Sequence, residues 1–166
     1  LFGPDMELGR WLRSKHIAIR LNDVLYVHGG LPPEVVERDL SLDDMNKAAR
    51  SSLDLKSYEL VFSDLPWFLF SSGGPLWYRS NVKCPGLIEE HRLDAALAAI
   101  GADRVVVGHT PTPNRKVLQR FGGRLIEIDT GMLNFYYSGI GHALILEGES
   151  VSVTSQTGVN SSVPDH

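Results

Sequence analysis

Cysteine and long apolar runs are nearly absent from this sequence. Cys84 is the only cysteine in the 166 residues, which excludes an intrachain disulfide and a cysteine-rich zinc module. No stretch reaches the roughly 18 consecutive apolar residues of a membrane-spanning helix. Positive charge is also scarce, because 16 Lys and Arg stand against 20 Asp and Glu for a net charge of −4. A nucleic-acid or membrane partner is therefore not expected.

The composition is that of one globular domain. The chain is 43% hydrophobic and 22% charged, which suits a single core of ordinary size. We expect this domain to span residues 1–155, with the polar residues 156–166 as a disordered tail. A chain that opens Leu1-Phe2, without an initiator Met, is expected to be a fragment of a longer protein. We expect that protein to be soluble, with its compartment left open and a cytoplasmic location slightly favoured.

The spacing of apolar residues predicts both helices and strands. Ser41 and Asp44 form a capping-box pair at the start of one predicted helix, and Gly101 stops another. The aromatic-rich segment 58–80 is expected to be an ordered loop. A helix that leads directly into a buried strand indicates an α/β or α+β fold, with a mixed sheet and flanking helices. Helices are expected at residues 5–14, 41–53 and 87–100, and strands at 16–21, 24–27, 104–107, 117–121, 124–128, 143–146 and 151–154.

The helix predicted at 87–100 carries expectations about its surroundings. Its apolar residues recur at helical spacing, beginning with Leu87 and Ile88. Its acidic residue Glu89 is expected to lie on a solvated face. We also expect this helix, together with the helix near Leu8, to pack on one face of the sheet.

Two predicted strands end in a histidine beside glycine. Residues 24–27 are followed by His28-Gly29-Gly30, and residues 104–107 by Gly108-His109. The carboxyl ends of strands are where α/β folds place their sites, and imidazole is the commonest metal ligand. The two histidines could hold one metal ion, or each could cap its own strand through a nearby carbonyl. They are far apart in the sequence, which leaves both interpretations open.

Three ordered motifs resemble one known family. They are Asn22-Asp23 through His28-Gly29-Gly30-Leu31, then Gly74-Pro75-Leu76-Trp77-Tyr78-Arg79, then Val107-Gly108-His109-Thr110-Pro111. Together they resemble the C-terminal half of the calcineurin-like metallophosphoesterases. Within that superfamily the sequence looks closest to the Shewanella-like, bacterial-type phosphoprotein phosphatases, over about residues 1–146. The resemblance implies half of a four-layer α/β/β/α sandwich.

The resemblance also implies a site. The histidines that match His28 and His109 are ligands of one metal of a dinuclear pair, and the arginine that matches Arg79 holds the substrate phosphate. Two divalent ions of manganese, iron, zinc or cobalt would activate hydroxide for in-line attack on a phosphomonoester. A guanidinium suits phosphate because it offers paired donors. Ser80 follows Arg79 where the family often has Gly, which is a departure in this loop.

Asp129 and Thr110 are further candidates near the strand ends. Asp129 could accept the second ring N–H of a ligand histidine and fix its tautomer, or it could simply begin a turn. Thr110 could support the site or be only a hydroxyl at the end of a strand. The sequence does not decide between these interpretations.

Three motifs of the family's N-terminal half are missing from the sequence: Asp-x-His, Gly-Asp-x-x-Asp-Arg and Gly-Asn-His-Glu. Two histidines alone make an incomplete hydrolytic site, since such sites use three or more protein ligands. We therefore expect the parent to be a hydrolase, a serine/threonine or tyrosine phosphatase acting on phosphorylated protein or small phosphomonoesters. This chain is expected to be inactive without its N-terminal half. The alternative is a non-catalytic module that binds a phosphorylated partner or a complementary half.

The missing N-terminal half also leads us to expect exposed apolar surface. Without the missing half, apolar strand residues such as Val105, Val107, Leu125 and Ile128 are expected to be partly uncovered. An uncovered face beside a sheet edge favours pairing, so a homodimer of the fragment is expected.

Overall fold

The computed structural model describes residues 1–158 and 160–166. None of the helices in this described part is long and apolar enough to cross a membrane. The helices are α1 (Glu7–Arg13), α2 (Glu34–Glu37), α3 (Leu42–Ser52), α4 (Ser57–Val61), α5 (Asp64–Phe70), α6 (Ser80–Lys83), α7 (Gly86–Ile100) and α8 (Asn134–Tyr137). The strands are β1 (Ala18–Leu21), β2 (Val24–Val27), β3 (Arg104–Val107), β4 (Leu118–Arg120), β5 (Leu125–Glu127), β6 (His142–Glu147), β7 (Ser150–Ser155) and β8 (Asn160–Ser162).

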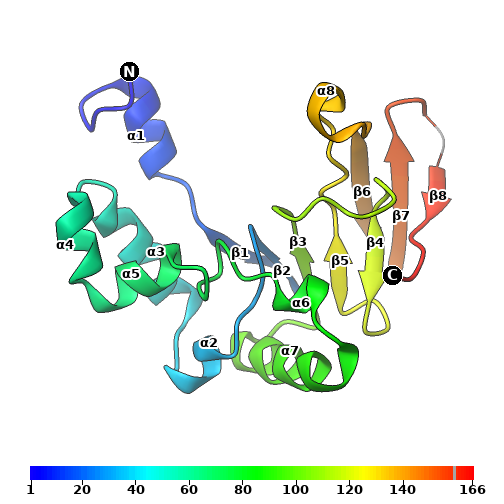
Figure 1. Ribbon diagram of the computed structural model, residues 1–166, viewed down its shortest axis with the longest axis horizontal. Helices are drawn as coiled ribbons and strands as arrows, with labels where there is room; N and C mark the ends of the chain where they lie inside the picture. Colours follow the sequence, from blue (N-terminus) through cyan, green and yellow to red (C-terminus); the bar gives the residue numbers. More distant parts are fainter. Residues whose placement is uncertain (159) are drawn as a thin grey trace.

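The larger sheet is mixed, as predicted. Its strand order is β1-β2-β3-β5-β4, with β2, β3 and β5 parallel and the edge strands β1 and β4 antiparallel to their neighbours (Figure 1). The strands predicted at 24–27 and 104–107 are therefore neighbours. Strands β6, β7 and β8 form a second, antiparallel sheet. The predicted α/β class is confirmed, and three pairs of strands that are consecutive in the predicted order, 16–21 with 24–27, 117–121 with 124–128 and 143–146 with 151–154, are antiparallel neighbours.

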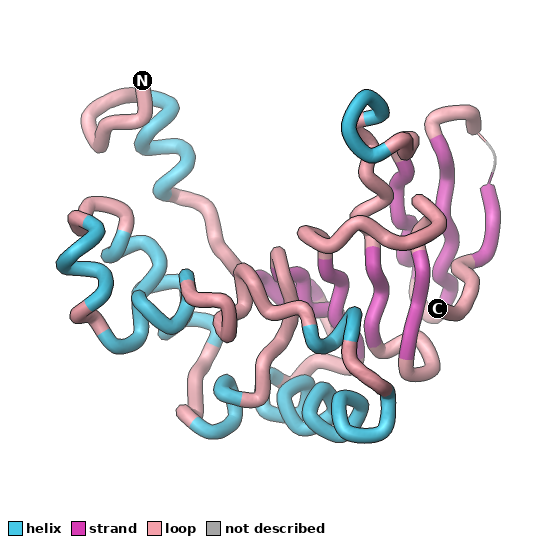
Figure 2. The backbone as a smooth tube through the Cα atoms, viewed as in Figure 1, coloured by secondary structure: helices cyan, strands magenta, loops and turns pink. Residues whose placement is uncertain are grey.

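The larger sheet is covered by helices on one face and, over part of its other face, by the smaller sheet. Leu25, Val105 and Leu125 pack with α7 on one face, whereas Val24 and Ile126 pack against the smaller sheet on the other. Figure 2 shows the helices and the smaller sheet on different sides of the larger sheet. The chain thus forms three layers, with a hydrophobic core between each pair of layers.

The sheet has a partly uncovered stretch at Ile19 and Leu21 of β1, which are 41% and 54% exposed, but three of the four residues expected to be uncovered are buried. Val105, Val107 and Leu125 are 0%, 1% and 0% exposed, so the prediction is wrong for these three residues. They are buried because α7 of this same chain lies over them. Ile128, just beyond β5, is 41% exposed, as expected.

Helix α7 forms where the sequence predicted it, but it buries a different face. Leu87 and Ile88 are 87% and 66% exposed, while Leu93 and Leu97 lie in the core. Glu89 is fully buried, so the prediction of a solvated Glu89 is wrong. Apolar residues occur on more than one side of this helix, so spacing alone could not identify the buried side.

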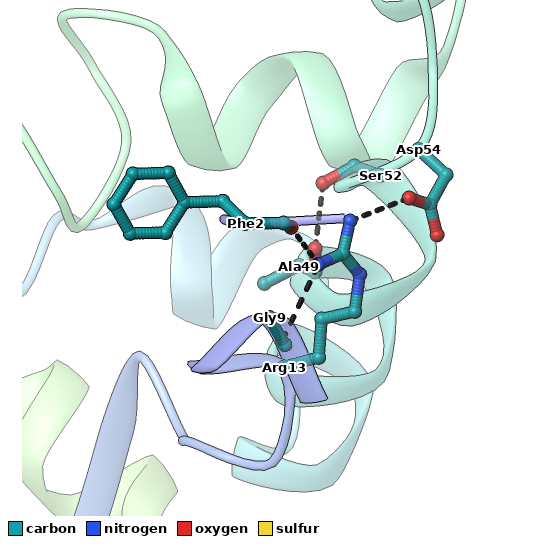
Figure 3. Close-up of polar contacts among 6 residues, drawn as sticks. All are labelled: Phe2, Gly9, Arg13, Ala49, Ser52 and Asp54. Carbon is teal, nitrogen blue, oxygen red and sulfur yellow. Dashed lines mark hydrogen bonds and ion pairs between the residues drawn. The ribbon is translucent and has the colours of Figure 1, made fainter. Parts of the chain in front are cut away.

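The prediction that the helix near Leu8 packs on the sheet is also wrong. Gly9 is the buried residue of α1, and Figure 1 shows this helix standing apart from the larger sheet. Arg13 connects α1 to the helical part of the fold instead. Its guanidinium donates to Phe2 O at 2.8 Å and pairs with Asp54 Oδ1 at 2.7 Å (Figure 3).

Most of segment 58–80, expected to be a loop, is helical. Helices α4 and α5 occupy residues 57–61 and 64–70, and an irregular loop remains at residues 71–79. Pro66 is the third residue of α5, in the first turn, where the missing N–H has no intrahelical acceptor in any case. Phe68 and Leu69 of this helix are buried in the core, which explains the apolar residues of the segment.

Residues 160–166 lie against the rest of the fold, in contrast to the disordered tail expected from composition; residue 159 lies outside the described residues. Strand β8 pairs with β7, and Val163 is buried in the core between the two sheets. Gln119 N donates to Pro164 O at 3.0 Å. One apolar side chain and regular backbone pairing thus hold a segment whose composition is polar.

Glu127 is a buried carboxylate on β5. Its residue is 1% exposed, and among the described residues neither carboxylate oxygen has a hydrogen-bond partner. Burial raises the pKa of Glu127 to about 7, and the charge of Arg120 offsets this only in part. His166 Nδ1 lies 3.6 Å from Glu127 Oε1. The carboxylate therefore titrates near neutral pH in the folded protein.

We expect Arg13→Ala to loosen α1. The substitution removes the donors to Phe2 O and Asp54, so backbone amides of α1 should exchange with solvent about tenfold faster. Arg10→Ala is the matched control, because the side chain of Arg10 donates to Asp5 O within the same terminal segment. Hydrogen exchange measured by mass spectrometry reports the result. Equal protection of α1 in both variants would contradict the role given to Arg13.

The stability of the protein should fall as pH rises through the range in which Glu127 ionises. The folded-state pKa lies above the ordinary 4.5, so the folded state binds more protons than the unfolded state between about pH 4.5 and 7. Relative to Glu127→Gln, the wild type should lose about 3 kcal/mol of unfolding free energy across that range and no more above it.

Urea unfolding at a series of pH values measures this difference. Glu37→Gln, a change at an exposed carboxylate on α2, is the control and should leave the pH profile of the wild type unchanged. A constant difference between wild type and Glu127→Gln at all pH values would show that Glu127 does not titrate as stated.

Candidate functional site

The two histidines that follow β2 and β3 meet at one edge of the larger sheet. Val27 and Val107 are register partners in the parallel pair, and Gly108 N donates to His28 O at 2.9 Å. His28 Nε2 and His109 Nδ1 are 3.0 Å apart. The interpretation in which each histidine only caps its own strand does not account for this contact between the rings.

Arg79 reaches the same point from the loop before α6. Its Nη2 lies 2.8 Å from His109 Nε2, so both ring nitrogens of His109 have a partner. Trp77 stands edge-on to the His109 ring, with centroids 4.7 Å apart and planes at 82°. His28, Arg79 and His109, three of the residues singled out in the sequence, are thereby brought together.

The electrostatic surroundings keep His109 neutral. Burial lowers the pKa of His109, and the charges of His28 and Arg79 lower it further. A guanidinium can only donate, so His109 Nε2 accepts from Arg79, and the ring proton lies on Nδ1, facing His28. A neutral imidazole is the form that can bind a metal ion.

The backbone of His109 is held in a rarely used conformation. Its φ is +64°, in the left-handed region that side chains other than glycine seldom adopt. Such a conformation costs roughly 1 kcal/mol or more and persists only where the surrounding structure imposes it. In this conformation Nδ1 of His109 faces His28.

The spacing of the two ring nitrogens fits a pair of metal ligands. Nitrogen ligands about 2.1 Å from one ion and about 90° apart lie about 3.0 Å from each other, which is the separation of His28 Nε2 and His109 Nδ1. Within residues 1–158 and 160–166, no group of three or more His, Cys, Asp or Glu side chains could hold a metal ion. The chain therefore offers two metal ligands and not a complete set.

Asp129 and Thr110 lie nearby but make no hydrogen bond to either ring in the described part of the chain. Asp129 Oδ1 accepts from Gly131 N at 3.0 Å, as expected for a residue that begins a turn. The charge of Asp129 raises the pKa of His109, but the effects of burial, His28 and Arg79 that lower this pKa are larger. Thr110 Oγ1 is buried, with no partner among the described residues. Neither residue is established as a support for the histidines.

The loop after His28 and the loop that carries Arg79 interlock. Gly29 N and Gly30 N donate to Pro75 O at 2.9 and 3.1 Å. The side chain of Asn81, two residues after Arg79, accepts from Leu31 N at 2.7 Å. The sequence reasoning missed Asn81, and its position just after the arginine motif was the only signal for it.

The comparisons with known proteins agree with this geometry. No protein-family model matches the chain. A crystal structure of a cold-active protein-tyrosine phosphatase from a psychrophilic Shewanella species is similar, with a TM-score of 0.87 and 34% identity over 98% of this chain and 47% of that one. The chain is related to the Shewanella-like phosphatases.

Two further relatives extend this relationship to eukaryotes. Shewanella-like protein phosphatase 1 of Plasmodium berghei is 26% identical over 126 residues, which are 70% of this chain and 32% of that protein. An uncharacterized protein of Schizosaccharomyces pombe is 28% identical over 144 residues, 81% of this chain and 40% of that protein. The chain thus spans less than half the length of each of these relatives. The predicted resemblance to the Shewanella-like phosphatases is confirmed.

Gly30→Ala should separate the two interlocked loops. A Cβ on Gly30 would lie 2.7 Å from Tyr78 O and 2.8 Å from Asn81 Oδ1, which is too close for ordinary contact. We expect the free energy of unfolding in urea to fall by roughly 1–3 kcal/mol. Gly73→Ala is the control, because its Cβ would meet only Ser71 Oγ at 3.9 Å, and it should change stability by less than about 0.5 kcal/mol. Equal stability of the two variants would contradict a tight contact at Gly30.

Proposed function

We propose that this chain contributes part of the site of a metal-dependent phosphatase that acts on phosphomonoesters, including phosphorylated protein. The observation that carries the proposal is the convergence of His28, His109 and Arg79 at the carboxyl ends of β2 and β3. The similarity to the Shewanella-like phosphatases supports it.

The chain's own residues have distinct roles in this proposal. His28 would bind a divalent ion through Nε2 and His109 through Nδ1, for which the ring proton of His109 would move from Nδ1 to Nε2 and Arg79 would turn from Nε2 toward the phosphate. An ion there would supply charge to neutralise phosphoryl oxygens. Arg79 would bind two phosphoryl oxygens with paired N–H donors and orient the phosphorus. Trp77 packs against the edge of the His109 ring and limits its rotation.

The other ligands would come from outside the 166 residues. With two histidines and no third candidate ligand in the described part of the chain, a full hydrolytic site is not assembled here. We therefore propose that the chain alone is inactive and that a dinuclear centre needs the additional length of the relatives. The same incompleteness favours a second candidate function, a non-catalytic module that binds phosphate through Arg79.

A chimera distinguishes the two candidates. In it, this chain replaces the matching part of the Shewanella cold-active phosphatase, which it covers over 47% of that protein. If the chain carries half of a phosphatase site, the chimera should hydrolyse p-nitrophenyl phosphate with added Mn²⁺ and lose activity with a chelator. His28→Ala and His109→Ala should each lower the rate by more than about 100-fold, because changes around metal ligands alone cost up to that much.

His91→Ala, an exposed histidine on α7, is the matched control and should leave the rate unchanged. A chimera that folds and binds Mn²⁺ but does not turn over substrate would contradict the phosphatase proposal and favour the binding module. Retained activity in His109→Ala would show that the metal role of this residue is wrong.

A further inference from the structure

Glu89 is a buried charge that the proposed function does not use. It lies on α7 at 0% exposure, and its Oε1 accepts two hydrogen bonds, from Tyr78 Oη at 2.6 Å and from Asn81 Nδ2 at 3.1 Å. Its Oε2 has no hydrogen-bond partner among the described residues, and Arg92 Nη1 is 3.7 Å away. Burial of a carboxylate with one weak ion pair costs free energy.

Stability therefore does not explain this residue. An apolar side chain of the same size at such a position is often neutral or stabilising. Burial and the hydrogen bond to Glu89 raise the pKa of Tyr78, so the phenol keeps its proton and remains a donor. The carboxylate and its two donors form a fixed unit beneath the loop that carries Arg79.

The two donors flank Arg79 in the sequence. Tyr78 comes immediately before it and Asn81 two residues after it, so Glu89 holds the backbone on both sides of the arginine. The side chain of Arg79 is exposed, and the contact to His109 is its one hydrogen bond among the described residues. The direction of its guanidinium therefore depends on where the backbone places it.

The same unit extends to the loop after His28. Asn81 donates to Glu89 through Nδ2 and accepts from Leu31 N through Oδ1, both as a buried side chain at 0% exposure. The chain of contacts from Glu89 through Asn81 to Leu31 thus joins α7 to both loops of the site.

We propose that Glu89 is a positioning residue that acts through Tyr78 and Asn81 to fix Arg79 relative to His28 and His109. The proposal rests on the proposed function only in taking Arg79 as the phosphate-binding group. Its physical content is preorganisation: an arginine already held in place loses less conformational entropy when an anion binds.

The test uses the full 166-residue chain. Glu89→Met removes the carboxylate that accepts from Tyr78 and Asn81. Glu89→Gln keeps an acceptor oxygen and should therefore leave the position of Arg79 as in the wild type. Leu93→Ala is the matched control, since Leu93 lies one turn further along α7, is fully buried in the hydrophobic core and makes no hydrogen bond through its side chain. It should destabilise the chain without moving Arg79.

Nuclear magnetic resonance gives two readouts that a merely structural role would not move. One is the heteronuclear Overhauser effect of the Arg79 Nε–Hε group, which reports its mobility. The other is the affinity for inorganic phosphate, followed through the same signal. Glu89→Met should make Arg79 mobile and weaken phosphate binding by about tenfold, while Glu89→Gln and Leu93→Ala should resemble the wild type.

The outcomes separate this proposal from the proposed function. An Arg79 that stays equally rigid in Glu89→Met overturns the positioning role. If Glu89→Met mobilises Arg79 but phosphate never perturbs the wild-type signal, the positioning role stands and the phosphate-binding part of the proposed function fails. If Glu89→Met does not fold, Tyr78→Phe removes one donor with the smallest change in shape. Unchanged Arg79 mobility in Tyr78→Phe would then overturn the proposal.

Discussion

The parallel register between β2 and β3 is the constraint on which the rest of the site depends. Because Val27 lies opposite Val107, the residues that follow both strands leave the sheet at the same edge. A shift by one residue would turn the core side chains of a strand to the other face. Val27 and Val107 both lie in the core beneath α7, so the packing that stabilises the sheet also brings His28 and His109 together.

The third member of the site depends on contacts of a different kind. Arg79 belongs to the irregular loop 71–79, which no sheet register places. Pro75 O accepts from two backbone amides of the loop after His28, and Asn81 and Glu89 hold the other end of the segment. Backbone pairing thus determines where the two histidines lie, whereas buried polar side chains help to determine where the arginine lies.

The sequence predicted features whose causes are local. The capping box of Ser41 and Asp44 and the left-handed Gly101 after α7 are both present, because each depends on residues within one turn. The strand ends at His28 and His109 were visible for the same reason. Their convergence was expected only from the family resemblance, since it follows from strand order, which no residue near either histidine encodes.

The sequence failed where a side chain depends on distant partners. Glu89 was predicted to be solvated because the residues that donate to it, Tyr78 and Asn81, lie outside α7. Likewise, nothing near Arg13 in the sequence indicates that its guanidinium pairs with Asp54, which follows α3. Periodicity reports which face of a helix is apolar, but it does not report which polar side chains find partners in the interior.

Two unfavourable features of the fold, the buried Glu89 and the left-handed backbone of His109, lie at the site. Glu89 accepts hydrogen bonds from the residues on either side of Arg79. Arg120 donates to the backbone carbonyls of Asn81 and Cys84, just after Arg79 in the sequence. The charge of Arg120 also lowers the pKa of buried Glu127. Buried carboxylates and a left-handed histidine each lower stability, and core packing elsewhere compensates for them. Glu89 and His109 thus suit a region in which the position of charged groups is kept at a cost in stability.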